Sequence, residues 1–194
     1  MPDPDDASLV AAVLDGRTDR FAELVRRHQG GLYRYALSMV HDRDTAADMV
    51  QDAFVRAYAS LGSCRDPGHF GAWLFRVLRN RCFDHLKGPQ RRAVPLDEAG
   101  PLVDSSESPD ARNERVRLRG EIRRALDRLP PVQREAFVMH YVHGLSYEDM
   151  AVRLDASVSA LKMRVLRARE ALAGALRERQ VTPAATARLS IRGG

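Results

Sequence analysis

The sequence is poor in cysteine and has no long uncharged apolar run. Cys64 and Cys82 are its only cysteines, which are too few for a disulfide framework and suit a reducing compartment. No apolar run approaches the roughly 18 residues that a membrane-spanning helix requires. The N-terminus, MPDPDDASLV, is acidic where a secretory signal would be basic and then apolar. These absences predict a cytoplasmic protein with no membrane insertion.

The sequence also lacks the short motifs of common catalytic and nucleotide-binding sites. No GxxxxGK[ST], GxGxxG, GxSxG, CxxC or HExxH occurs in it. His140 and His143 fall on one expected helix, but a metal site needs more ligands than these two at a recognisable spacing. We therefore expect a protein that is not an enzyme and that has no catalytic residue, no metal and no cofactor.

What the sequence does contain is charge, and this charge is unevenly distributed. The chain has 194 residues and a formal net charge of +5. Residues 21–92 hold 12 basic and 7 acidic side chains, and residues 111–194 hold 17 and 9. Residues 93–110 hold 5 acids and no basic residue. Two basic bodies of this kind suit a polyanionic partner such as nucleic acid.

Apolar residues recur at helical spacing along almost the whole chain, and no alternating β-branched run is long enough for a sheet. The clearest stripe ends just before Gly62, and Asp44 is placed to cap the helix that carries it. The stripe consists of Val50, Ala53, Phe54, Ala57, Tyr58 and Leu61. We expect it to be the buried face of a helix.

Similar patterns on either side complete a helical N-terminal domain. A short apolar segment covers residues 9–14, and a long helix is expected after Thr18 with a weak point at the glycine pair 30–31. A further helix is expected over residues 70–87. Residues 8–87 are therefore predicted to form a helical bundle.

Residues 88–110 break the helical pattern with four prolines, two glycines, a serine cluster and five acids. This composition is typical of a flexible linker. Helical periodicity returns over residues 111–179 and is interrupted at Pro130–Pro131. Residues 180–194 are small and polar, and we expect a flexible tail there.

Two short helices expected near the C-terminus have the helix-turn-helix pattern. Ser146 can cap the first, with Asp149 as a variant capping-box partner, and Gly144 ends the helix before it. Ser157 can cap the second after a short turn at 154–156. The fold class is thus all-α, with an N-terminal helical bundle and a C-terminal helix-turn-helix domain joined by an acidic flexible linker.

The second of these helices has two distinct faces. The stripe expected to be buried consists of Val158, Leu161, Val165, Ala168 and Leu172. The other face carries Ser159, Lys162, Met163, Leu166, Arg167 and Arg169, with Arg164 at its edge. A helix fits the major groove of DNA, where cationic side chains reach phosphates and guanine edges. A solvated basic face is the alternative, and Met163 and Leu166 could contact either thymine methyl groups or a partner helix.

Two polar patches stand out in the N-terminal bundle. Asp48, Gln51, Asp52 and Arg56 lie opposite the apolar stripe of their helix. Acids near a helix N-terminus are favoured by the helix dipole, and Asp52 can pair with Arg56 one turn later. A structural role and a role in docking a partner therefore stand equal for this patch.

The second patch lies in the segment FGAWLFRVLRNRCFDHLK. Trp73, Arg76 and Asn80 share one stripe of its helix, flanked by Arg79 and Arg81. Such groups can stack on an unpaired base, hold phosphate and hydrogen-bond a base edge. A core position is the alternative for the single tryptophan, whereas an asparagine in mid-helix has poor propensity and is harder to explain by structure alone.

Three segments in order carry a family resemblance: DRDTAADMVQDAFVRAYASL, FGAWLFRVLRNRCFDHLK and LPPVQREAFVMHYVHGLSYEDMAVRLDASVSALKMRVLRAREAL. Together they resemble a bacterial RNA polymerase sigma factor of the extracytoplasmic-function (ECF) group of the sigma-70 family, over about residues 8–176. The resemblance implies that residues 8–87 are sigma region 2 and residues 111–179 are region 4. It implies an initiation subunit that binds core RNA polymerase, recognises −35 and −10 promoter elements and assists strand opening.

The resemblance also assigns residues to these tasks. Contacts with core polymerase, at the β′ clamp, fall on Asp48, Gln51 and Asp52, with Met49 and Phe54 as apolar support. Contacts with the single-stranded −10 element fall on His69, Trp73, Arg76, Arg79 and Asn80, the last lining a pocket for a flipped base behind the loop of residues 63–69. Contacts with duplex DNA at −35 fall on Ser159, Lys162, Met163, Leu166 and Arg167. Met163 stands where relatives often carry a small polar residue, and Asp52 where glutamate is commoner.

Further partners follow from the same resemblance. They are the β flap of the polymerase, an anti-sigma factor, and the polymerase cleft, through which the acidic linker would thread. The main alternative is a stand-alone helix-turn-helix transcriptional regulator whose helical N-terminal domain senses a ligand or dimerises. A helical adaptor that binds only proteins is a second alternative.

Overall fold

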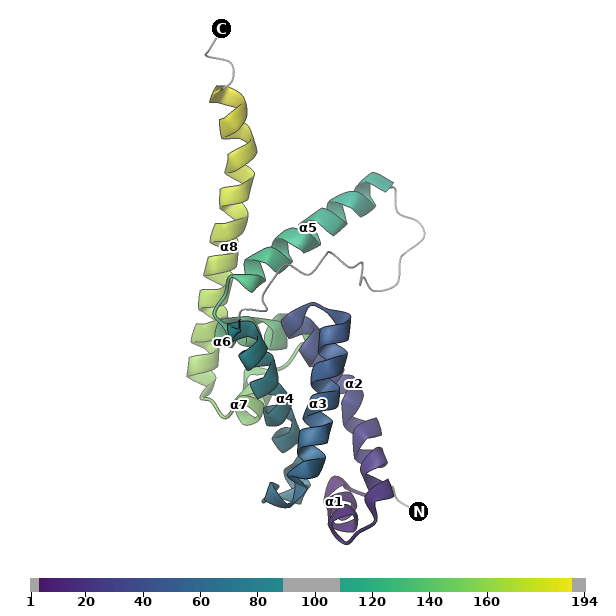
Figure 1. Ribbon diagram of the computed structural model, residues 1–194. Helices are drawn as coiled ribbons and strands as arrows, with labels where there is room; N and C mark the ends of the chain where they lie inside the picture. Colours follow the sequence, from purple (N-terminus) through teal and green to yellow (C-terminus); the bar gives the residue numbers. More distant parts are fainter. Residues whose placement is uncertain (1–3, 89–108, 190–194) are drawn as a thin grey trace. The chain divides into compact units, whose positions relative to one another are not determined.

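The computed structural model describes residues 4–88 and 109–189, and within them every regular element is helical (Figure 1). The first four α-helices are α1 (Asp6–Leu14), α2 (Phe21–Val40), α3 (Arg43–Ala59) and α4 (Phe70–Lys87). The next four are α5 (Pro109–Asp127), α6 (Pro131–Phe137), α7 (Tyr147–Leu154) and α8 (Val158–Leu189). Short helical turns lie between some of these helices. They are η1 (Thr18–Arg20) before α2, η2 (Leu61–Ser63) and η3 (Pro67–His69) between α3 and α4, and the π-helical η4 (Val138–Val142) after α6.

The helices belong to two compact units, with α1 to α4 in the N-terminal unit and α5, α6 and α8 in the C-terminal unit. The predicted all-α fold is therefore confirmed. The predicted linker, residues 88–110, lies outside the described residues except at its two ends. The last helix differs from the prediction, since it continues past Arg179 to Leu189. This stretch contains several alanines, which have the highest helix propensity.

In the N-terminal unit, α2, α3 and α4 pack on one another and α1 packs on α2 and α4. Small side chains allow α3 to approach its neighbours closely, because Ala46, Ala53 and Ala57 are fully buried. Across the same core, the rings of Tyr35 and Phe75 meet edge to face with their centroids 4.6 Å apart. The core thus holds three long helices side by side, and their outer faces carry the polar patches.

The apolar stripe predicted for α3 is confirmed except at Tyr58. The other five members are buried, whereas Tyr58 is 46% exposed. Its ring lies edge-on to Phe21 at 5.1 Å, so the phenol covers the rim of the core and leaves its hydroxyl near water. A stripe drawn from sequence spacing alone does not distinguish a rim position from a central one.

One local prediction for this unit is wrong, and another is sharpened by the structure. The cap of α3 is Asp42 and not Asp44, because the Asp42 carboxylate accepts a hydrogen bond from the Thr45 amide at 2.7 Å. The glycine pair at 30–31 does not interrupt α2, which runs unbroken to Val40. Each glycine costs about 1 kcal/mol of helix stability, and packing of α2 on α3 and α4 offsets this cost.

In the C-terminal unit, α8 packs against both α5 and α6. The junction between α5 and α6 is held by Arg134, which is only 2% exposed. Its Nε donates a hydrogen bond to the Leu126 carbonyl at 3.0 Å, and its guanidinium pairs with Asp127 at 2.6 Å. A carbonyl in the last turn of α5 thereby gains a hydrogen-bond donor. The interruption predicted at Pro130–Pro131 is present, and Pro131 is the first residue of α6.

The predicted caps of the helix-turn-helix are confirmed. The Ser146 hydroxyl accepts from the Asp149 amide at 3.0 Å and donates to the Asp149 carboxylate at 2.7 Å, which begins α7. The Ser157 hydroxyl accepts from the Ala160 amide at 3.2 Å and begins α8. Between the helices, Asp155 adopts the left-handed conformation with φ 50°.

Candidate nucleic-acid and protein interfaces

The outer face of α3 is acidic and is tied to α4. Asp48 and Gln51 are exposed, whereas the Asp52 side chain is 33% exposed. Asp52 pairs with Arg56 at 2.9 Å, as predicted, and across to α4 with Arg81 at 2.5 Å. Partial burial raises the pKa of the Asp52 carboxyl, but the Arg56 hydrogen bond and the nearby arginine charges outweigh it and hold this pKa below its ordinary value.

The two apolar residues predicted to support this face, Met49 and Phe54, are buried at 5% and 7% exposure. Met49 therefore holds α3 against the core, whereas Phe54 also borders a groove beside the acids. Next to the acids runs an apolar groove of about 780 Å³ between α2 and α3. Its lining includes Phe21, Val25, Tyr33, Gln51, Val55 and Tyr58. Sequence reasoning missed this groove; its one signal is Val55, an apolar residue outside the stripe that is 61% exposed.

The predicted patch on α4 is brought together by the helix. Arg76 and Asn80 are exposed, and Trp73 is half-buried with its ring 5.9 Å from that of Phe70. Arg79 lies over the Phe83 ring at 4.4 Å. Trp73 is thus neither a core residue nor a free side chain, since one side of it rests on the core.

The loop before α4 is organised by Asp66, which sequence reasoning missed. One carboxylate oxygen accepts from the Gly68 amide at 3.1 Å, and the other lies 2.8 Å from Nδ1 of the exposed His69. The Cys64 thiol donates to the Asp66 carbonyl at 3.5 Å, and burial raises the pKa of this thiol. The Asp-Pro-Gly sequence, typical of a turn, was the available signal.

The outer face of α8 carries the residues predicted to contact duplex DNA. All five are exposed: Ser159, Lys162, Met163, Leu166 and Arg167. On the opposite side Leu161, Val165, Ala168 and Leu172 are buried as predicted, while Val158 is half-buried. Lys162 lies 5.7 Å from the centre of the Tyr147 ring, and neither it nor Arg167 forms an ion pair with a described residue. This face therefore presents its positive charge outward.

His140, one of the two histidines considered as metal ligands, has a structural role. Nδ1 of His140 lies 3.0 Å from the Leu145 carbonyl, and its ring stacks on Tyr147 at 4.4 Å. In the part of the chain that the structure describes, no three His, Cys, Asp or Glu side chains gather in a way that could hold a metal ion. Nor is any helix among these residues long and apolar enough to cross a bilayer.

Comparisons with known proteins agree with the resemblance seen in the sequence. The family described as Sigma-70 region 2 matches residues 24–92, and Sigma-70, region 4 matches residues 119–172. The RNA polymerase sigma-H factor of Pseudomonas aeruginosa is 32% identical over 180 residues, which is 88% of this chain and 93% of that protein. The ECF RNA polymerase sigma factor SigM of Mycobacterium tuberculosis is 34% identical over 87% of this chain and 83% of its own.

Solved structures give the same answer. CnrH, in complex with the cytosolic domain of CnrY, has a TM-score of 0.60 and 30% identity and covers 89% of this chain and 97% of its own. The sigma factor RpoE of Bartonella quintana, in complex with the anti-sigma factor NepR, has a TM-score of 0.52 and 26% identity over 81% and 96%. A stand-alone helix-turn-helix regulator is not favoured, because these similarities span both units. Since relatives of this kind match it over most of their own length, the protein belongs to the ECF group of RNA polymerase sigma factors, which direct transcription initiation.

Proposed function

We propose that this sigma factor divides promoter recognition between its two units. In this proposal residues 8–87 act as region 2, which binds core polymerase and the opened −10 strand, and residues 111–179 act as region 4, which reads −35. Residues 88–110 link them, and residues 180–194 form a tail. The observation that carries the proposal is that α3, α4 and α8 each bury one stripe and turn the predicted contact residues outward or to the rim, apart from the buried Met49 and Phe54.

Core polymerase would dock on α3. Asp48 and Gln51 supply exposed polar contacts to the β′ clamp, and Gln51 also borders the apolar groove. Asp52 serves this face in two ways, because it offers a carboxylate and also holds α3 to α4 through Arg81. Charged groups beside an apolar surface are a common arrangement in protein interfaces.

The opened −10 strand would lie along α4. The half-buried Trp73 offers a fixed ring on which a base can stack, Arg76 can hold a phosphate, and Asn80 can hydrogen-bond a base edge. Extruding a base costs a few kcal/mol of stacking and pairing. A site whose parts are already fixed can offset this cost for the correct base, and so assist strand opening.

Helix α8 would lie in the major groove of the −35 duplex. Lys162 and Arg167 can reach phosphates or guanine edges. Met163 and Leu166 are 47% and 42% exposed, which suits contact with thymine methyl groups. The turn before α8 is fixed by the Ser157 cap, so the helix enters the groove as a rigid unit.

The remaining assignments rest on the family. We place the protein in the cytoplasm with the polymerase, without a catalytic activity of its own. Region 4 would also meet the β flap. Because the sigma factor RpoE is held in complex with the anti-sigma factor NepR, and CnrH is likewise in complex with a second protein, we extend an anti-sigma partner to this chain.

The proposal is tested by run-off transcription with core bacterial polymerase on a fragment library of the source genome, with and without this protein. We expect new start sites that share paired −35 and −10 elements. A chain that yields no starts but binds duplex DNA tightly without polymerase would contradict the proposal and favour the stand-alone regulator.

A further inference from the structure

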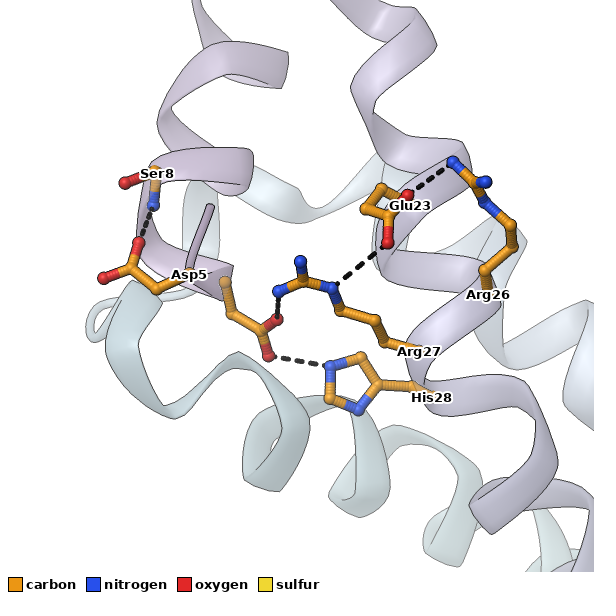
Figure 2. A network of polar contacts seen from close by, with 7 residues as sticks. Asp5, Ser8, Glu23, Arg26, Arg27 and His28 are labelled. Atoms are coloured by element: carbon orange, nitrogen blue, oxygen red, sulfur yellow. Dashed lines mark hydrogen bonds and ion pairs between the residues drawn. The ribbon is translucent and has the colours of Figure 1, made fainter. Parts of the chain in front are cut away.

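A polar cluster ties the N-terminal helix to α2 (Figure 2). The Asp6 carboxylate at the start of α1 lies 2.7 Å from Nε2 of His28 and 3.3 Å from the Arg27 guanidinium. We call these three residues the α1 clasp. Each of their side chains is between 21% and 24% exposed, so the clasp is largely shielded from solvent. Arg27 is further braced by Glu23 at 3.3 Å on its own helix.

The His28 ring of the clasp also forms part of the seat of α4. Its centroid lies 5.5 Å from that of Phe70, the first residue of α4, in an edge-to-face arrangement. A side chain at Gly71 would place its Cβ 2.8 Å from Cε1 of His28, so the first turn of α4 fits directly against the imidazole. Phe70 is fully buried and its ring reaches that of Trp73. A continuous line of contacts therefore runs from Asp6 to Trp73.

The helix that the clasp holds also packs on the loop before α4. Helix α1 contacts η2 and η3, the two turns that flank the Asp66-organised segment. Its buried side chains include Leu9, Val10 and Val13. The clasp and this packing act on the same place, because η3 leads directly into Phe70. Loosening α1 therefore affects both the loop and the first turn of α4.

We infer that Asp6 and His28 are positioning residues for −10 recognition, which act by fixing Phe70 and, through it, the Trp73 ring. This inference rests on the proposed role of α4 in binding the opened strand. Trp73 has only one side on the core, so its orientation depends on what holds Phe70. A clasp that served only to attach α1 would affect stability and leave the Trp73 environment unchanged.

The test uses holoenzyme assembled from core bacterial polymerase and the full chain. Its template is a promoter fragment that run-off transcription has identified. Asp6→Ala is expected to lower permanganate reactivity of the unpaired −10 thymines about three- to tenfold. Core affinity and binding to the −35 duplex should stay within about twofold. Asp6→Asn keeps an acceptor for His28 and is expected to restore most of the opening.

Glu23→Ala is the matched control, because Glu23 also pairs with Arg27 but its ion pairs, with Arg26 and Arg27, stay within α2. It should open the promoter like the unaltered chain. Trp73 is the only tryptophan, so its emission in the free protein reports on its position. Asp6→Ala should shift this emission and make it easier to quench with acrylamide, whereas Glu23→Ala should do neither.

Unchanged opening with unchanged Trp73 emission in Asp6→Ala would overturn the inference. So would an equal loss of −35 binding, core affinity and opening, which would indicate general destabilisation. If the unaltered chain directs no initiation, the proposed function fails by itself. In that case the emission of the free variants still decides whether Asp6 positions Trp73.

Discussion

Trp73, Arg79 and His69 of the N-terminal unit each touch another side chain of that unit. In the C-terminal unit Lys162 lies 5.7 Å from the centre of the Tyr147 ring, and Arg167 projects from the exposed face of α8. In the first unit these three groups are held by neighbours before any ligand arrives. In the second, rigidity comes from the buried stripe beneath α8, and the side chains on the opposite face of the helix are exposed.

This difference matches two kinds of nucleic-acid recognition. A base taken out of a duplex has lost its stacking and pairing, so the site that receives it gains most when its parts are already in place. A duplex presents its base edges in a groove of fixed shape, and long side chains on a rigid helix can reach them. Under the proposed function each unit would serve one form of DNA, and the following experiments test that distinction.

The largest effect is expected from reversing charge on α3. Asp48→Arg together with Asp52→Arg should weaken core binding by at least about 100-fold, since like charges placed at an interface cost several kcal/mol. Affinity is measured by competition for labelled core polymerase. Asp52→Asn alone is the control for loss of the ion pair between Asp52 and Arg81. If the double variant binds core polymerase with near-normal affinity, α3 is not part of the docking surface.

Removing Arg134 should separate the stabilities of the two units. Arg134→Ala removes the hydrogen bond to the Leu126 carbonyl and the ion pair with Asp127, at an expected cost of about 3 kcal/mol. Denaturant unfolding is followed by circular dichroism for all helices and by Trp73 fluorescence for the N-terminal unit. The circular dichroism transition should move to lower denaturant, and the Trp73 fluorescence transition should stay where it is. Arg124→Ala, at an exposed position, is the control and should move neither transition. A parallel shift of both transitions would show that the two units do not unfold independently.

On α8, Lys162→Ala or Arg167→Ala should each cost about 1–3 kcal/mol of −35 binding if the side chain contacts bases. Holoenzyme binding is measured on intact and base-substituted −35 elements over a range of salt concentrations. A loss that is uniform over all sequences and reduces only the salt dependence would indicate phosphate contacts. Promoter opening at −10 should follow occupancy and show no separate defect.

On α4, Asn80→Ala should weaken use of the −10 element about fivefold, which corresponds to one lost hydrogen bond of about 1 kcal/mol. The measurement is binding of holoenzyme to single-stranded −10 oligonucleotides next to binding of the −35 duplex. Asn80 is exposed, so folding should be unaffected. Equal losses at both elements would contradict its assignment to the pocket.

The smallest expected effect is on the stability of the protein at acidic pH. Because the folded pKa of Asp52 is lowered, its ion pairs stabilise the protein above the ordinary aspartate value of 3.8 and lose this effect as pH falls through the folded pKa. Asp52→Asn should therefore be less stable than the unaltered chain near neutral pH, and the two should converge in acid. A constant difference down to strong acid would show that Asp52 acts through packing alone.

The parts of the fold that follow from local sequence could be predicted. The stripe of α8, the Ser146 and Ser157 caps and the Asp52–Arg56 pair each depend on residues within a few positions of one another, so spacing is enough to find them. The α3 cap was missed by two residues because Asp42 and Asp44 are both good capping residues, and the sequence does not say which adopts extended backbone.

The parts that depend on neighbouring helices could not be predicted. The groove between α2 and α3, the Asp52–Arg81 pair and the contact of Asp6 with His28 each join segments far apart in the sequence. Each side chain looks ordinary by itself, and its role appears only when the helix packing is known. Half-burial of Trp73 belongs to this class, since the sequence favoured either a core or a surface position.

The absence of a side chain at Gly71 has a consequence for how such proteins vary. His28 is held by Asp6 on one side and by Phe70 on the other, so its ring has no room to yield to a methyl group at position 71. Positions 28 and 71 are therefore expected to change together among relatives, with a smaller residue at 28 wherever 71 is larger than glycine. Met163 and Leu166 on α8 are 47% and 42% exposed, so under the proposed function promoter preference at −35 is free to diverge there one substitution at a time.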